Sequence, residues 1–165
     1  MQTEQIVSDW LTKAYPAQEL MFTERNKPYR NYLVERHRGT TYAMAIESLV
    51  MQRETERLQV VVGATIQQAK IVRHYLDQLY GRKVVDFGEF MFVSAATFPR
   101  FVPSVPFDLY VMDYLYLPNP VLGSLAASID PVEGITLVRQ TWYSALPPDP
   151  RLQLLAKARS IKQLS

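Results

Sequence analysis

Three short segments carry the side chains that are best suited to bind a phosphate group. Residues 35–41 (Glu-Arg-His-Arg-Gly-Thr-Thr) join an apolar run to a helical pattern. Residues 63–70 place Gly-Ala-Thr before a second helical pattern, and residues 108–114 form an apolar run that contains Asp113. Backbone N–H groups at a helix N-terminus attract anions, and the basic side chains Arg36 and Arg38 lie next to such a terminus. These residue types predict a site for a nucleotide or a nucleic-acid backbone.

Composition excludes several other kinds of site. The chain has no Cys, which rules out disulfides, thiolate zinc sites, iron–sulfur clusters and cysteine nucleophiles. His37 and His74 have no nearby cluster of carboxylates, so a histidine metal centre is not favoured. Lys and Arg number 18 against 16 Asp and Glu, and the net charge of +2 is too small to indicate nucleic-acid binding by bulk charge.

Length and hydropathy predict one soluble domain over residues 1–165. The 165 residues, 48% of them hydrophobic, suit a single hydrophobic core. No apolar run reaches the roughly 18–20 residues that span a bilayer, and the N-terminus lacks a signal pattern. We expect a cytoplasmic protein with no membrane partner.

Strand and helix patterns alternate along the chain. Strands are expected at 30–35, 58–63, 89–94, 107–112 and 134–140, with a further strand-like run at 83–87, and helices at 3–15, 40–57, 66–80, 121–129 and 150–164. Pro16 is expected to end the first helix, and residues 17–30 and 95–106 are expected to be loops. This alternation predicts βαβ units, and hence an α/β three-layer sandwich with a mostly parallel central sheet. Ligands of such folds bind at the carboxyl ends of the strands, where the three segments would meet.

The order and spacing of these parts resemble the N-terminal ATPase domain of phage large terminase subunits and, more loosely, superfamily-two helicases. RHRGTTYAMAIESLV resembles the phosphate loop and its helix, VVVGATIQQAKIV the second unit, FDLYVMDYLYLP the acidic strand and GITLVRQTWYS the coupling strand. The likeness covers roughly residues 29–144. It implies a P-loop NTPase (RecA-like) fold with ATP and Mg²⁺ as ligands. It also implies DNA and phage packaging or replication proteins as partners, in the host cytoplasm if the protein is viral.

Several motif positions depart from that family. Val34 stands where the first Gly of the phosphate loop is expected, Thr40 replaces the Lys, and Tyr114 replaces the Glu that polarises the attacking water. Thr41 is retained at the magnesium-ligating hydroxyl position, and Asp113 matches the acid that holds magnesium. Losing one well-placed charge typically slows such chemistry by ~10²–10³. The resemblance therefore implies a degenerate ATPase fold with very little hydrolysis.

We interpret the chain as a non-catalytic accessory or regulatory protein on this fold. The candidate residues are Arg36, Arg38, Gly39, Thr40 and Thr41 for phosphate, Thr41 and Asp113 for a metal, and Arg36 and Arg38 for nucleic acid. Two alternatives remain. The first is an active NTPase whose basic residue is displaced to Arg36, Arg38, Lys27 or Lys70. The second is a purely structural or interaction protein, in which Gly39-Thr40-Thr41 is an ordinary helix cap and Asp108 and Asp113 are strand-end acids. The sequence leaves the oligomeric state open.

Overall fold

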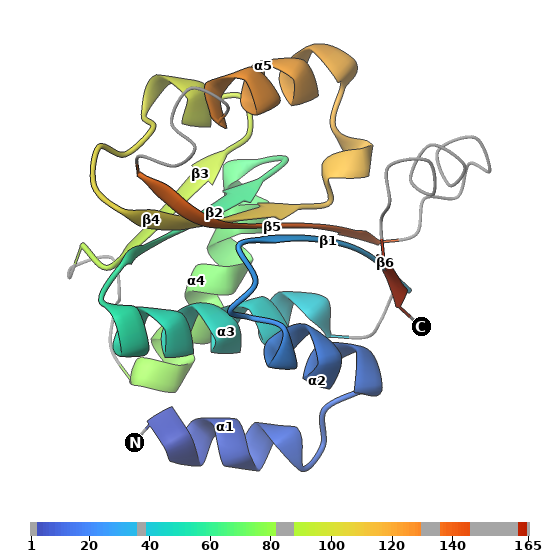
Figure 1. The fold of residues 1–165 in the computed structure, drawn as a ribbon, viewed down its shortest axis with the longest axis vertical. Coiled ribbons are helices and arrows are strands. Elements are labelled where there is room, and N and C mark those ends of the chain that lie inside the picture. The colour runs from blue at the N-terminus through green and yellow to red at the C-terminus, as the bar shows by residue number, and fades with distance from the viewer. Residues whose placement is uncertain (1–2, 36–38, 82–87, 130–135, 146–161, 165) are drawn as a thin grey trace.

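The computed structural model describes residues 3–35, 39–81, 88–129, 136–145 and 162–164. Its elements form three layers, with a central sheet between two groups of helices (Figure 1). One face of the sheet carries α1 (Thr3–Leu11), α2 (Pro16–Thr23), α3 (Thr40–Thr55) and α4 (Ile66–Tyr80). The other face carries α5 (Asn119–Ile129) and a 3₁₀ turn at Phe98–Arg100. A second 3₁₀ turn, Tyr114–Tyr116, follows the fourth strand.

The sheet of the described residues has six strands in the order β3-β2-β4-β5-β1-β6, and every pairing is parallel. The strands are β1 (Tyr29–Val34), β2 (Leu58–Gly63), β3 (Phe90–Ser94), β4 (Phe107–Met112), β5 (Leu137–Ala145) and β6 (Lys162–Leu164). Strand β5 lies between β1 and β4. Because all strands run the same way, their carboxyl ends meet at one edge of the sheet.

The alternation of side chains along the strands divides the core in two. Val61 and Tyr110 face the layer of α1 to α4, whereas Val60, Leu109 and Val111 face α5. All five are 0% exposed. A strand buried on both faces explains why β2 and β4 read as nearly continuous apolar runs.

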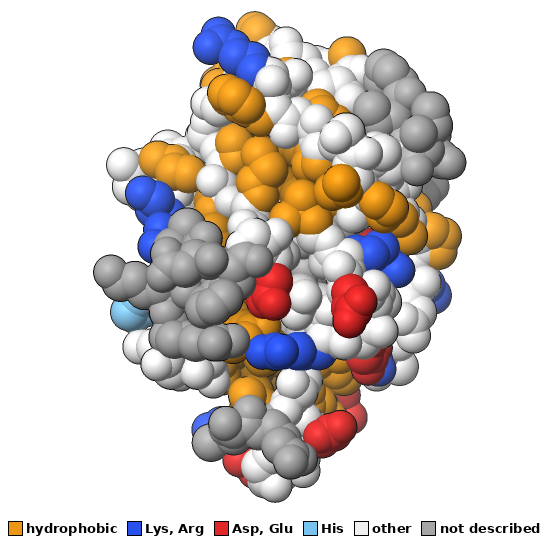
Figure 2. Space-filling view, turned by 90° about the vertical axis from the view of Figure 1, so that its left-hand side faces the viewer, with side chains coloured by type: hydrophobic (Ala, Val, Ile, Leu, Met, Phe, Trp, Pro, Cys, Tyr) orange, Lys and Arg blue, Asp and Glu red, His pale blue; other side chains and the backbone are white. Residues whose placement is uncertain are grey.

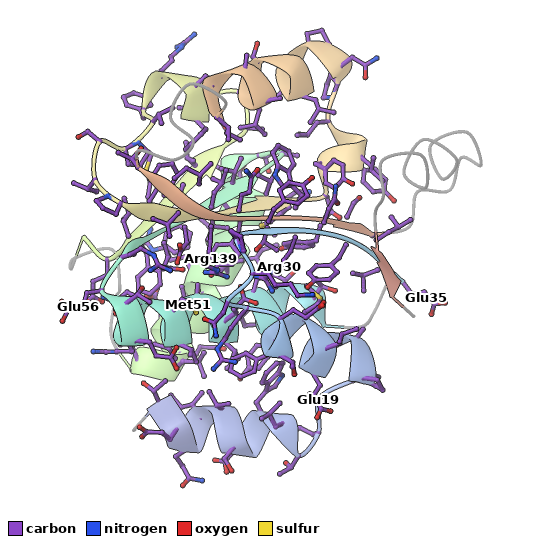
Figure 3. All side chains as sticks on the ribbon, in the orientation of Figure 1. Glu19, Arg30, Glu35, Met51, Glu56 and Arg139 are labelled. Carbon is purple, nitrogen blue, oxygen red and sulfur yellow. The ribbon has the colours of Figure 1, made fainter. Side chains whose placement is uncertain are left out.

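A buried polar network ties α3 to the amino-terminal halves of the strands (Figure 3). Glu47, in the middle of α3, accepts hydrogen bonds from Arg30 of β1 at 2.8 Å and from Arg139 of β5 at 2.6 Å. Arg139 also donates to Asp108 of β4 at 2.9 Å, and Arg57 reaches the same carboxylate at 3.0 Å. Burial by itself lowers the pKa of the Arg30 guanidinium, but the Glu47 carboxylate outweighs it and raises that pKa.

The predicted α/β class with a parallel sheet is confirmed, and β2 and β4 have the expected bounds. The expected helix over 3–15 ends at Leu11, and part of the expected loop 17–30 is helix α2. Pro16 begins this helix rather than stopping one. The first N–H groups of a helix have no partner within the helix, so the missing N–H of a Pro at the first helical position costs no hydrogen bond. The Tyr15 N–H is bound by the Gln18 side chain at 2.7 Å, which supports the start of α2.

Two further expectations about the C-terminal part are wrong. Strand β5 does not end at Gln140 but continues to Ala145, because β1 pairs with it over that whole stretch. Residues 162–164, expected as the end of a helix over 150–164, form β6 beside β1. The rest of that expected helix, and the strand-like run 83–87, lie outside the described residues. In both cases pairing with a distant strand overrides the local pattern.

Candidate anion-binding site

A pocket of about 570 Å³ opens at the carboxyl edge of the sheet. It lies where β1, β5 and β4 end and α3 begins, and the register pairs Val34 with Ala145 and Met112 with Tyr143. The described residues that line it are Val34, Glu35, Gly39, Thr40, Thr41, Tyr42, Gln68, Tyr75, Asp113, Tyr116, Tyr143 and Ala145. The topology therefore brings the loop before α3 and the end of β4 to one cavity, although 72 residues separate Thr41 from Asp113 in the chain.

The loop reaches α3 through a left-handed residue. Gly39 has φ +67°, a conformation that L side chains rarely adopt, and its carbonyl accepts the first helical hydrogen bond from Ala43 at 3.0 Å. The Gln18 side chain also donates to this carbonyl, at 2.8 Å. Gly39 has no side chain that could cap the helix, and the first-turn N–H groups beside Thr40 and Thr41 have no partner within α3 itself. These groups carry the positive end of the helix dipole.

Asp113 lies on the opposite wall in a left-handed conformation, with φ 48°. One carboxylate oxygen, Oδ1, accepts a hydrogen bond from the Ala145 N–H at 2.9 Å, which joins the ends of β4 and β5. The side chain is thereby held at the rim of the pocket that Thr41 also lines. A hydroxyl and a carboxylate placed in this way match the oxygen ligands that Mg²⁺ prefers.

Tyr143 brings a buried hydroxyl to the same pocket. The residue is 3% exposed, and its hydroxyl oxygen is buried next to the Thr41 side chain. Burial raises the pKa of Tyr143 well above its usual value, the Asp113 carboxylate raises it further, and the nearby Thr41 hydroxyl offsets part of this rise. The phenol therefore keeps its proton at neutral pH, and a ligand oxygen in the pocket would satisfy that donor.

Tyr114 does not take part in this pocket. Its hydroxyl donates to the Asn31 side chain at 2.7 Å, and its ring packs edge-on against Trp142 with centroids 5.6 Å apart. The residue is 2% exposed and belongs to the core beneath α5. The residue after Asp113 therefore both lacks a carboxylate and packs its ring on the far side of the sheet.

Helix α4 supplies the remaining wall. Thr65 caps this helix by accepting from the Gln68 N–H at 3.3 Å, and the Gln68 side chain accepts from the Ala64 N–H at 3.0 Å. Gly63 is required at the end of β2, because a Cβ there would lie 2.7 Å from backbone atoms of the α4 start. Tyr75 packs edge-on against Tyr42 with ring centroids 5.2 Å apart, and burial raises the pKa of Tyr42.

Of the residues proposed from the sequence, Gly39, Thr40, Thr41 and Asp113 line one pocket. Arg36 and Arg38 lie outside the described residues. Asp108 lies at the other end of β4, 0% exposed, where it belongs to the buried network. In the described ranges no group of three or more His, Asp or Glu is placed to hold a metal ion. Magnesium here would need phosphate and water as further ligands.

Sequence reasoning missed the aromatic wall of the pocket, Tyr42, Tyr75, Tyr116 and Tyr143. One signal was available for Tyr75, which follows Gln68 by seven residues and so lies on the same face of a helix, two turns away. For Tyr143 the signal appears only in the sheet register, which places it beside Met112 at the end of β4.

The structure is similar to solved structures of phage large terminases. It matches the large terminase ATPase domain of Thermus phage P74-26 with a TM-score of 0.60 and 14% identity, covering 85% of this chain and 68% of that one. It also matches the large terminase of a second, thermophilic bacteriophage with a TM-score of 0.57 and 13% identity. The chain has the fold of a terminase-type ATPase domain. The expected RecA-like class is thus confirmed.

The terminase-type likeness is one of fold, since both identities are low. The alignment with the second terminase covers 99% of this chain but only 44% of that protein, so the chain spans less than half of its length. Neither a protein-family model nor a curated protein matches the sequence. Within the described ranges no helix is both long and apolar enough to cross a membrane.

Proposed function

We propose that the chain binds a nucleoside phosphate with Mg²⁺ in the pocket at the start of α3 and acts as a non-catalytic accessory or regulatory protein. The observation that carries this proposal is the convergence of hydrogen-bond donors on one cavity. The first turn of α3 and the buried Tyr143 hydroxyl, which lies next to Thr41, both reach a pocket that Asp113 also lines.

The residues present fit a magnesium–phosphate ligand. Phosphate oxygens would accept from the α3 N–H groups and the Tyr143 hydroxyl, while Thr41 and Asp113 would hold the metal. Magnesium, when bound, would neutralise the negative charge of the phosphate oxygens. The lining also includes Glu35, so the described walls carry two carboxylates and no basic side chain. A free phosphate would meet these charges directly, whereas a magnesium-bound phosphate would not.

The same site is poorly equipped for hydrolysis. Thr40 occupies the position where the resemblance implies a Lys, and the Tyr114 ring is buried on the other side of the sheet. Each missing charge is expected to slow phosphoryl transfer by ~10²–10³. We therefore expect binding with very slow turnover.

One observation favours a second candidate, an active NTPase. Glu35 lines the pocket from the end of β1, so its carboxylate could orient a water in place of the residue after Asp113. This candidate also needs a basic residue near the phosphates, such as Arg36 or Arg38. Phosphate release distinguishes it from the first proposal.

By analogy of fold with large terminases, we propose that the partners are DNA and phage packaging or replication proteins, met in the host cytoplasm. DNA binding through Arg36 and Arg38 would weaken with salt, with a slope that counts the phosphates contacted. An affinity that does not change with salt would contradict that contact.

The proposed function is tested by nucleotide binding and phosphate release, each with and without Mg²⁺. Mg-ADP and Mg-ATP are expected to stabilise the fold, by about 2.7 kcal/mol at 100 times Kd. Asp113→Asn keeps an oxygen for the Ala145 N–H and should weaken Mg-nucleotide binding, whereas the exposed control Glu19→Gln should not. Turnover that Asp113→Asn abolishes would establish the active NTPase. A chain that no nucleotide stabilises would be a structural or interaction protein instead.

A further inference from the structure

A second pocket, of about 360 Å³, lies at the opposite edge of the sheet. It is formed where α3 ends and where β2 and β4 begin, and its lining includes Gln52, Glu56, Glu89, Leu58, Val105 and Pro106. Figure 3 places Glu56 and Glu35 at opposite ends of the molecule, so this pocket is far from the candidate anion-binding site. In Figure 2, which looks onto this end, a hydrophobic area adjoins acidic side chains.

Two buried oxygens of the lining lack hydrogen-bond partners in the described part of the chain. Gln52 is 7% exposed, and its Oε1 atom is buried without a partner. The Oε2 atom of Glu89 is in the same situation. The Glu89 backbone is itself fixed, because its carbonyl accepts from the Gln59 N–H at 3.1 Å. Buried acceptors are normally satisfied, so this pair indicates a ligand that donates hydrogen bonds.

The charged residues of the pocket also favour a ligand that donates hydrogen bonds. Arg57 also lines it, but its guanidinium is bound to Asp108 at 3.0 and 3.3 Å. Among the described residues no cation forms an ion pair with Glu56 or Glu89. Glu56 is held in a left-handed conformation, with its N–H bound to the Gln52 carbonyl at 2.8 Å. Glu56 and Glu89 therefore both belong to the lining, and within the described ranges the guanidinium of Arg57 is engaged by Asp108 rather than by either of them.

The rest of the lining is apolar. Leu58, Val105 and Pro106 form one wall, and Val105 is 52% exposed. A long basic side chain has the matching shape, because its aliphatic stem packs along apolar surface while its charged head binds acceptors. Arginine suits three separate acceptors better than lysine, since its planar fork presents five N–H donors.

We propose that this pocket, the Gln52–Glu89 pocket, binds an arginine side chain presented by a partner protein. The guanidinium lies between the Gln52 amide oxygen and the two carboxylates, and the stem lies on the apolar wall. Lysine binds more weakly at the same place.

The test is an NMR titration of the full chain with the peptide acetyl-Ala-Arg-Ala-amide, observing the Gln52 side-chain amide and the Glu89 backbone. Saturable shifts are expected with this peptide, and none with a norleucine peptide of the same length. Glu89→Gln is expected to weaken binding about tenfold through loss of a charge-assisted bond, and Glu19→Gln to leave it unchanged. Gln52→Leu provides a second variant, and urea unfolding checks that each variant is folded.

Absence of saturable shifts at Gln52 with the arginine peptide overturns the proposal. So does equal binding of the norleucine peptide, which would mean that the pocket recognises only apolar surface. Unchanged affinity in a folded Glu89→Gln variant does the same. None of these outcomes depends on nucleotide binding at the other edge of the sheet.

Discussion

Replacing Glu47 by Gln is expected to destabilise the fold severely, although the change conserves size and shape. Its carboxylate, 1% exposed, accepts from Arg30 and Arg139 at the centre of the buried network. Without the charge, Arg30 loses its only described carboxylate partner and Arg139 retains only Asp108. Removing one partner of a buried ion pair typically costs about 3–5 kcal/mol. That is a large share of the roughly 5–15 kcal/mol by which a domain is stable.

Urea unfolding measures this cost. Trp10 and Trp142 are both buried, on opposite sides of the sheet, so tryptophan fluorescence reports on both cores. For an m value of about 2 kcal/mol/M, the midpoint should fall by about 1.5–2.5 M. The matched control is Glu54→Gln, since this carboxylate is half exposed and lies 3.8 Å from Arg25. An exposed pair is worth at most about 1 kcal/mol, so the control midpoint should move by less than about 0.5 M.

A Glu47→Gln midpoint within about 0.5 M of the wild type would refute the reasoning, because it would mean that the buried guanidinium groups do not need this carboxylate. The double variant Arg30→Met with Glu47→Leu gives a further check. It removes both charges of one pair and should be more stable than the charge-unbalanced Glu47→Gln variant.

Three other predictions follow from the site and the core. Gly39→Ala should lower the free energy of unfolding by about 1–2 kcal/mol because of the left-handed backbone at this position. It should lower it further because the new Cβ would lie 2.5 Å from Gln18 Nε2. Gly123→Ala, which has open space around it, is the control in the unfolding measurement. Tyr143→Phe should weaken Mg-ADP binding about five- to tenfold in a calorimetric titration while leaving the urea midpoint the same or higher, and an unchanged affinity would remove this hydroxyl from the site. Burial raises the pKa of Tyr110 and Tyr143 in the folded state, so above about pH 10 only the unfolded chain releases these protons. The contribution of these tyrosines to the free energy of unfolding should therefore be fully present below about pH 10. Above it, the free energy of unfolding should fall by up to about 1.4 kcal/mol per pH unit for each buried tyrosine. Urea midpoints between about pH 8 and 11, with tyrosinate absorbance, test this, and a flat profile contradicts it.

Local patterns were enough to predict the buried middle of the fold. The runs LQVVVG and FDLYVM are apolar at nearly every position, and a strand buried on both faces needs that composition, so β2 and β4 were predicted with their correct bounds. The capping Thr65 and the left-handed Gly81 likewise marked both ends of α4.

Local patterns failed where a distant partner decides the structure. Nothing within Lys162–Leu164 indicates a strand, and these residues form one because the edge of β1 is there to pair with. The extension of β5 to Ala145 has the same cause. Helix α2 was missed because Pro16 is read as a stop, although at a first helical position it is a start.

The sequence by itself determined which groups the candidate anion-binding site contains. The types and order of Gly39, Thr40, Thr41 and Asp113 follow from the chain alone, as does the neutral Tyr114 where a carboxylate was expected. Only the tertiary structure decided where these groups and the unpaired acceptors lie. A parallel sheet gathers strand ends by their spatial order, so Tyr143 joins one pocket while Gln52 and Glu89 meet at the opposite edge. Spacing along the chain carries no record of that order, because each crossover helix can place its strand beside any neighbour.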